Sequence, residues 1–261
     1  MSPKPLYQTK LQNLPISIFR TNEELGMAAA EEAAGIIQQA IDERQRANII
    51  LATGNSQLTF LAALRKEEID WSKVNVFHMD EYVGIDPNHP ASFPGFLKRH
   101  FLDYINVRAF YPIRGQVGYL EAVCKEYAEL LRAYPADLCA LGIGENGHLA
   151  FNDPPFAEFN DPVWVKVVKL DEVSRQQQVK EGHFAAIQEV PTHAITLTIP
   201  ALLAAKRVLA IVPEARKAEA VYRALRGPLS EACPASILRQ TAHAHLFLDV
   251  DSAAKVYPNA V

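Results

Sequence analysis

Short runs of β-branched and aliphatic residues alternate along this chain with longer segments of helical pattern. Continuous apolar runs of this kind are typical of strands that are buried on both faces. The intervals between them, roughly 10–25 residues, are long enough for a helical crossover, and such crossovers join parallel strands. We therefore expect an α/β protein, a three-layer α/β/α sandwich with a Rossmann-like, mainly parallel sheet.

The expected elements follow from this alternation. The predicted strands are Ile16–Phe19, Ala47–Ala52, Val74–Met79, Leu138–Ile143, Val163–Val168, Ala194–Thr198, Arg207–Val212 and His245–Asp249. The predicted helices are Asn22–Arg46, a segment after Ser56 that ends near Lys66, Phe96–Tyr104, Tyr119–Ala133 and Ala215–Arg226. Thr21, with Glu24 three residues later, has the pattern of a capping box before the first helix. No repeat or Gly/Ser linker interrupts the pattern, so residues 1–261 are expected to form a single domain.

Composition and charge exclude several classes of protein. Hydrophobic residues make up 49% of the chain and charged residues 21%, which is usual for a globular protein and not for a disordered one. The net charge of -4 has no basic excess that would favour a nucleic acid or an anionic membrane as partner. The longest apolar stretch, near Ala194–Ala205, is too short and too polar to span a bilayer.

The cysteines and the N-terminal segment indicate the compartment. Cys124, Cys139 and Cys233 form no CxxC pair, and so sparse a set is typical of a reducing environment. The first ten residues are polar and lack the apolar core of a signal peptide. We therefore expect a cytoplasmic protein.

The first candidate motif is Thr53-Gly54-Asn55-Ser56, directly after a predicted strand and before a helix. Small residues let the backbone approach an anion, and a helix N-terminus presents free N–H groups. The segment is neither a Walker A loop nor a GxGxxG motif. The alternative is an ordinary tight turn in which Asn55 or Ser56 caps the helix.

The second motif, His78 to Gly84, contains adjacent carboxylates at Asp80 and Glu81, again at the end of a strand. Burial of a carboxylate is costly unless it is used or paired, and a carboxylate at a strand end is well placed to act as a general base. The alternative is a turn with solvated acids, although loops at strand ends often carry sites.

The third motif, Gly142 to Asp153, has three glycines and a single histidine, His148. Carboxylates at Glu145 and Asp153 flank this histidine in the sequence, and a nearby carboxylate fixes the tautomer of an imidazole. The alternative is a lone loop histidine with a capping aspartate.

Basic residues in the later segments form the fourth group: Arg175, Lys180, Arg216 and Lys217. Lys217 opens a predicted helix and is a candidate to close an anion site beside Thr53–Ser56, although most such residues are solvated surface charges. A zinc site is not expected, because His243 and His245 have no third ligand at a suitable spacing.

In this order, the motifs resemble those of the glucosamine-6-phosphate deaminase family. The matching pieces are LATGNS at 51–56, MDEYVG at 79–84, GIGENGHLAFNDP at 142–154 and PASIL at 234–238. The resemblance runs from about Ala47 to Asp249. The related 6-phosphogluconolactonases share a GxxxGH element, but they typically have DER where this chain has Asp80-Glu81-Tyr82, which favours the deaminase branch.

The resemblance implies conversion of glucosamine 6-phosphate and water to fructose 6-phosphate and ammonia, with no cofactor and no metal. Asp80 matches the proton-transferring carboxylate, and His148 matches the acid–base residue that opens the sugar ring. Asp153 matches an acidic residue, usually Glu, in the relay of that histidine, and Asn146 stands where some members carry Asp. The phosphate-binding set implied by the family is Thr53, Gly54, Asn55, Ser56, Arg175 and Lys217.

This chain also departs from the family pattern. Asp153 is one methylene shorter than the usual Glu, Gln57 replaces a frequent Pro, and residues 176–184 differ from the usual lid. Two alternatives therefore stay open, a 6-phosphogluconolactonase or an isomerase of another amino-sugar phosphate. A more distant one is a non-catalytic sugar-phosphate sensor, although Met1–Leu14 is too short for a helix-turn-helix. The expected partner is a small-molecule sugar phosphate, with the chain acting as a monomer or a homo-oligomer.

Overall fold

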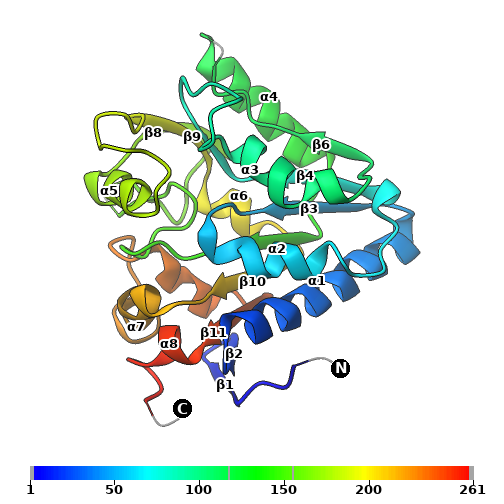
Figure 1. Ribbon diagram of the computed structural model, residues 1–261, viewed down its shortest axis with the longest axis vertical. Coiled ribbons are helices and arrows are strands. Elements are labelled where there is room, and N and C mark those ends of the chain that lie inside the picture. The colour runs from blue at the N-terminus through cyan, green and yellow to red at the C-terminus, as the bar shows by residue number, and fades with distance from the viewer. Residues whose placement is uncertain (1–2, 117, 155, 259–261) are drawn as a thin grey trace.

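An eight-stranded sheet runs through the middle of the molecule (Figure 1). The computed structural model describes residues 3–116, 118–154 and 156–258. The strand order is β1-β2-β11-β10-β7-β3-β4-β6, and only β1 and β2 pair antiparallel, the other neighbours being parallel. These strands are β1 (Tyr7–Leu11), β2 (Leu14–Phe19), β3 (Ala47–Leu51), β4 (Val74–His78), β6 (Ala109–Tyr111), β7 (Leu138–Leu141), β10 (Arg207–Val212) and β11 (Ala244–Asp249).

Helices cover both faces of this sheet, as the predicted three-layer sandwich requires. One face packs against α1 (Asn22–Arg44), α2 (Leu58–Leu64) and α3 (Phe93–His100). The other packs against α4 (Leu120–Ala133), α6 (Ile199–Leu203), α7 (Ala218–Arg226) and α8 (Val250–Ala253). Successive residues of the central strands alternate between the two apolar cores, which explains why their sequences are continuously apolar. Among the described residues, no helix is both long and apolar enough to cross a bilayer.

The first helix begins where its sequence predicts. The Thr21 side chain accepts the backbone N–H of Glu24 (3.2 Å), and the Glu24 carboxylate accepts the backbone N–H of Arg20 (3.0 Å). The helix ends at Arg44 because Gln45 adopts a left-handed conformation with φ of 56°. The contacts of Thr21 and Gln45 satisfy backbone groups that a helix end leaves without partners. Glu24 binds the N–H of the residue before the cap and not that of Thr21, so the reciprocal half of the capping box is not formed.

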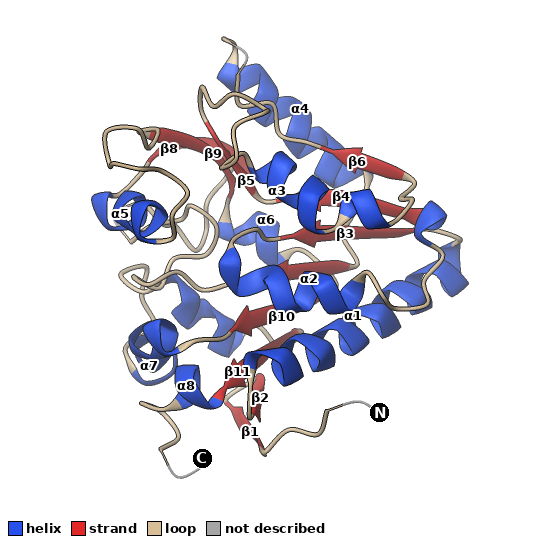
Figure 2. Cartoon of the chain, in the orientation of Figure 1, coloured by secondary structure: helices blue, strands red, loops and turns tan. Residues whose placement is uncertain are grey.

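The predicted strands at 163–168 and 194–198 are present, but they do not join the main sheet. They form β8 (Val165–Lys169) and β9 (His193–Leu197), which pair antiparallel with each other and, through β9, with β5 (Asp80–Tyr82) in a second, three-stranded sheet. The chain leaves the main sheet after β4, and the carbonyl of Met79 accepts the backbone N–H of Leu197 (2.8 Å). This departure carries Asp80 beyond the carboxyl end of β4. The segment after β8 forms α5 (Glu172–Lys180), which lies beyond the ends of the main strands (Figure 2).

A buried polar cluster lies at the amino ends of the central strands of the main sheet. The Asp137 carboxylate is 2% exposed and accepts the backbone N–H of Asn48 (3.0 Å). It also pairs with Arg44 and with Lys206 (3.2 Å). The side chain of Asn75 donates to that of Asn48 (2.9 Å), so the starts of β3, β4 and β7 are tied together.

We expect Asp137→Ala to lower the free energy of unfolding by about 1–3 kcal/mol, because it leaves the buried N–H of Asn48 without its acceptor. Urea denaturation measures this loss, with Asp103→Ala, at an exposed aspartate, as the control. An unchanged midpoint for Asp137→Ala would show that the cluster contributes no stability.

Candidate active site

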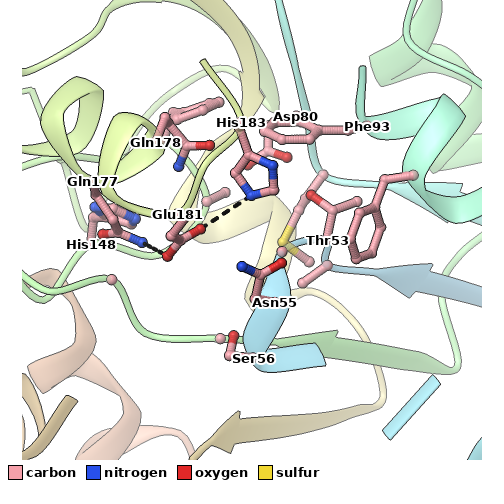
Figure 3. Close-up of a pocket in the computed structure, with 18 of the residues that line it drawn as sticks. Thr53, Asn55, Ser56, Asp80, Phe93, His148, Gln177, Gln178, Glu181 and His183 are labelled. Atoms are coloured by element: carbon pink, nitrogen blue, oxygen red, sulfur yellow. Dashed lines mark hydrogen bonds and ion pairs between the residues drawn. The ribbon is translucent and has the colours of Figure 1, made fainter. Parts of the chain in front are cut away.

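Loops that follow β3, β4, β7 and β10 meet at the carboxyl ends of the parallel strands and line one cavity (Figure 3). This is the edge at which parallel α/β sheets bind their ligands. The cavity brings together most of the sequence-predicted site residues: Thr53, Gly54, Asn55, Ser56, Asp80, His148 and Lys217. Asn146 and Asp153 lie directly behind His148, whereas Arg175 lies elsewhere. The chemical roles of all these sequence-predicted residues stay predictions.

The backbone conformation of Gly54 and one buried side chain fix the shape of the loop from Thr53 to Ser56. Gly54 has φ of +99°, a conformation that favours glycine. Gln57, found where the family often has Pro, is buried, and its amide donates to the carbonyl of Ile211 (3.1 Å) and to Ser56 Oγ (3.2 Å). The loop is therefore fastened to β10, the strand that leads to Lys217.

Asp80 is the first residue of β5 and is only 7% exposed. Burial raises the pKa of its carboxyl to about 8, with a further contribution from the charge of Glu81. Burial also raises the pKa of Glu81 to about 7, although it accepts hydrogen bonds from the N–H of Tyr82 (2.8 Å) and the hydroxyl of Ser92 (2.8 Å). The cavity thus contains a carboxyl that exchanges its proton close to neutral pH.

His148 and Asp153 form a second, separate proton-transfer group. His148 Nδ1 lies 3.0 Å from Asp153 Oδ1, so the shorter side chain of Asp153 reaches the imidazole. Asp153 also accepts the hydroxyl of Ser174 (2.5 Å) and the amide of Asn146 (3.0 Å). Burial opposes ionisation of Asp153, but these hydrogen bonds and the His148 ring outweigh it and hold the pKa of Asp153 well below its usual range. The anion accepts the Nδ1 proton, which leaves Nε2 to exchange protons.

Steric contacts explain why two positions of this loop are glycine. A Cβ on Gly144 would lie 2.2 Å from the ring of His148, so the imidazole rests directly on backbone. Gly147 has φ of +90°, and a Cβ there would lie 2.7 Å from the sulfur of Cys233. These two glycines therefore let the loop pack closely against the histidine and against Cys233.

Asn146 braces this loop and does not line the cavity. Its Nδ2 donates to Asp153 and its Oδ1 accepts the backbone N–H of His148 (3.0 Å). It therefore fixes the position of both members of the pair. These contacts support a positioning role for Asn146, and its expected part in the catalytic set stays a prediction.

Lys217 ends a 3₁₀ turn (Ala215–Lys217) after β10 and is 3% exposed. Burial, together with the positive charge of Arg216, lowers the pKa of its ammonium to about 8. A bound anion would favour the charged form of this lysine.

Arg175 is not part of the cavity lining. Its guanidinium donates to the carbonyls of Ile187 (2.6 Å) and Val190 (2.9 Å), which holds α5 against the chain that follows it. The expected phosphate contact therefore has no support from its position. The reason is that Arg175 and Gln177 lie on different faces of α5, and only Gln177 lines the cavity.

The sequence analysis did not select four cavity residues that come from α5 and the turn after it (Figure 3): Gln177, Gln178, Glu181 and His183. Phe184 packs against the rings of Tyr82 and His89, with centroid distances of 5.6 and 5.2 Å. This anchor directs the preceding His183 to the cavity. The signal in the sequence that could have pointed to these residues is that the stretch 176–184 departs from the lid segment usual in the family.

Within the described part of the chain, no group of three or more His, Cys, Asp or Glu side chains is arranged to hold a metal ion.

Comparison with known proteins places the chain among its relatives. A family model described as glucosamine-6-phosphate isomerases/6-phosphogluconolactonase matches residues 20–247. The chain belongs to this family. The glucosamine-6-phosphate deaminase of Bacillus thuringiensis strain Al Hakam is 35% identical over 237 residues, which cover 91% of this chain and 87% of that protein.

Solved structures agree with this assignment. A monomeric glucosamine-6-phosphate deaminase has a TM-score of 0.84 at 30% identity, covering 92% of this chain and 99% of its own. The 6-phosphogluconolactonase of Trypanosoma brucei has a TM-score of 0.75 at 19% identity, covering 96% and 100%, and shares the fold.

We expect Asp80→Asn to be more stable than the wild type, increasingly so as pH rises. The pKa of the folded state, about 8, exceeds the unfolded value of about 3.9, so the wild type loses stability between these pH values and the neutral amide does not. Thermal melts from pH 4 to 9 measure the difference, with Asp103→Asn as the exposed control. Parallel curves for Asp80→Asn and wild type would contradict the expectation.

Proposed function

We propose that this protein catalyses the isomerising deamination of glucosamine 6-phosphate to fructose 6-phosphate and ammonia. The observation that carries the proposal is that two chemically different proton-transfer groups line one cavity: Asp80, and His148 with Asp153 behind it. Ring opening and proton transfer between carbons are separate steps that need separate groups. The names of the 35% and 30% identical relatives support the same reaction.

The substrate phosphate is bound by the loop Thr53–Ser56 and by Lys217. The loop offers backbone N–H groups at the start of a helical segment, and Lys217 supplies a buried positive charge. This remote interaction holds the sugar in register for the chemistry.

His148 opens the pyranose ring. This step moves a proton from the anomeric hydroxyl to the ring oxygen and leaves an open-chain aldose. The imidazole mediates that transfer through Nε2, while Asp153 stabilises the protonated ring.

Asp80 then transfers a proton from C2 to C1. The substrate carries an ammonium group on C2, and this cation beside Asp80 favours the ionised carboxylate that the free protein disfavours. Isomerisation forms an imine at C2, to which water adds, and ammonia then departs to leave the ketose. Every atom of the products comes from the substrate and one water molecule, without a cofactor.

A coupled assay for ammonia and fructose 6-phosphate tests the proposal. We expect wild type to release both from glucosamine 6-phosphate, and to be much less active on unphosphorylated glucosamine. A panel with galactosamine 6-phosphate and 6-phosphogluconolactone separates the alternatives, because a lactonase releases no ammonia. Hydrolysis of the lactone alone would overturn the proposal.

The two proton-transfer groups should separate by step. We expect His148→Gln to lose most turnover of the pyranose, yet to exchange the C1 proton of fructose 6-phosphate with solvent when ammonium is supplied. Asp80→Asn should lose both activities by about 10²–10⁴-fold, because its amide cannot accept a proton. Deuterium incorporation followed by NMR measures the exchange. Equal loss of exchange in both variants would contradict the division of roles.

The charge of a sugar phosphate retains it in the compartment where it is made, so we propose a cytoplasmic location. The cavity residues described above all come from one chain, so the chemistry is open to a monomer or to each subunit of a homo-oligomer. We also propose that residues 1–261 act as a single domain.

A further inference from the structure

A second cavity lies on the other side of β5 from the candidate active site. Its volume is about 520 Å³, within the range of ~300–1,000 Å³ that is usual for small-molecule sites. Successive residues of a strand point to opposite faces, so Asp80 lines the first cavity and Glu81 lines the second. Helix α3 also borders both cavities, with Phe93 and Phe96 toward the first and Gly95 toward the second. The second cavity is therefore distinct from the site of the proposed reaction.

The walls of this second cavity are mainly apolar. They come from the chain on either side of α3, from α3 itself, and from β6 and the chain that follows it: Ile85, Pro94, Leu102, Phe110, Pro112 and Ile113. The charged side chains of Lys98, Asp103 and Arg114 also line the cavity, but these three residues are exposed to solvent. Walls of this kind bind the apolar body of a small molecule.

Glu81 and Ser92 are the buried polar side chains of this lining, at 2% and 1% exposed. Glu81 Oε1 accepts the backbone N–H groups of Tyr82 (2.8 Å) and Phe93 (3.4 Å). Among the described residues, Oε2 accepts only the hydroxyl of Ser92 (2.8 Å). Because a carboxylate oxygen has two acceptor sites, Glu81 Oε2 keeps one of them free.

The charge of Glu81 is also uncompensated. Within the described part of the chain, the groups that act on its pKa are burial and three hydrogen bonds, none of them from a cation, and burial raises this pKa to about 7. A buried carboxylate without a cation is costly, and a charged hydrogen-bond donor relieves that cost. In the proposed reaction the ammonium group of the substrate meets this need at Asp80, but nothing meets it at Glu81.

We propose that the second cavity is a binding site for an organic ammonium ion, whose charged group donates to Glu81 Oε2 while its apolar body packs against the walls described above. An anion is disfavoured because the carboxylate repels it, and a neutral apolar molecule leaves the free acceptor site unused. A primary amine with an aryl or alkyl body meets both requirements. This inference goes beyond the proposed function and does not depend on it.

Titration of the whole chain with 2-phenylethylamine at pH 8, followed by NMR, tests the proposal. At this pH Glu81 is mostly ionised, and an alkylamine is protonated as a lysine side chain is. We expect saturable binding, and at least about 10-fold weaker binding of 2-phenylethanol, which has the same shape but no charge. Equal binding of the alcohol, or no saturable binding of the amine below about 10 mM, overturns the proposal.

Matched variants locate the bound amine. Glu81→Gln removes the charge at nearly constant size, so we expect at least about 10-fold weaker binding. Asp80→Asn makes the same kind of change one residue away and should keep the wild-type affinity, because Asp80 lines the other cavity. If Glu81→Gln does not fold, Leu102→Trp provides a second variant, since it fills the cavity and leaves Glu81 intact. Tyr104→Trp, in the same 3₁₀ turn but outside the lining, is its control.

Three results contradict the site. Wild-type binding by folded Glu81→Gln or Leu102→Trp overturns it, and loss of binding in Asp80→Asn places the amine in the first cavity. Sedimentation supplies the third: an oligomer that Lys98→Glu dissociates shows that a second copy of the chain covers this cavity. Amine binding without release of ammonia from glucosamine 6-phosphate means that the proposed function fails alone, and the reverse result means that the second site fails alone.

Discussion

The carboxylate of Asp153, which is fully buried, joins segments that come from different parts of the chain. It contacts the ring of His148, the amide of Asn146 and the hydroxyl of Ser174, and it accepts the backbone N–H of Asp171 (3.3 Å). The glycine-rich loop after β7 and the start of α5 are therefore positioned by one anion. A buried charge is tolerated only when it is satisfied in this way, so the orientation of the imidazole and the placement of α5 depend on each other.

Two other ionisable groups that line the cavity, Asp80 and Lys217, are much less well compensated than Asp153. Burial raises the pKa of Asp80 and lowers that of Lys217, so in the free protein both are displaced toward their neutral forms. Such displacement costs folding stability and is typical of functional sites. A ligand with an ammonium group and a phosphate reverses both shifts, because each of its charges favours the ionised form of one protein group. Binding energy is thus coupled to the protonation state that the reaction needs.

Arg216, which precedes Lys217 in the chain, has its charge compensated by neighbouring carboxylates. Arg216 is surrounded by Glu145, Glu181 and Glu214, so its charge is neutralised within the chain. One of these carboxylates, Glu181, lies in the segment 176–184, in which the sequence departs from the family lid.

The amino-acid sequence by itself determined the parallel sheet, the start of the first helix and the motifs at the strand ends. These features depend on local periodicity, on capping by residues three positions apart, and on the rule that parallel strands end at one edge. Only the tertiary structure decided that β5, β8 and β9 form a separate sheet, because strand partners are chosen by long-range packing. Likewise, Arg175 and Glu181 lie within one short polar segment, and nothing local distinguishes a cation that binds backbone carbonyls from a carboxylate that enters the cavity. Arg175 is held by the carbonyls of Ile187 and Val190. The turn that follows Glu181 is anchored by Phe184 against Tyr82 and His89, contacts that join residues about a hundred positions apart.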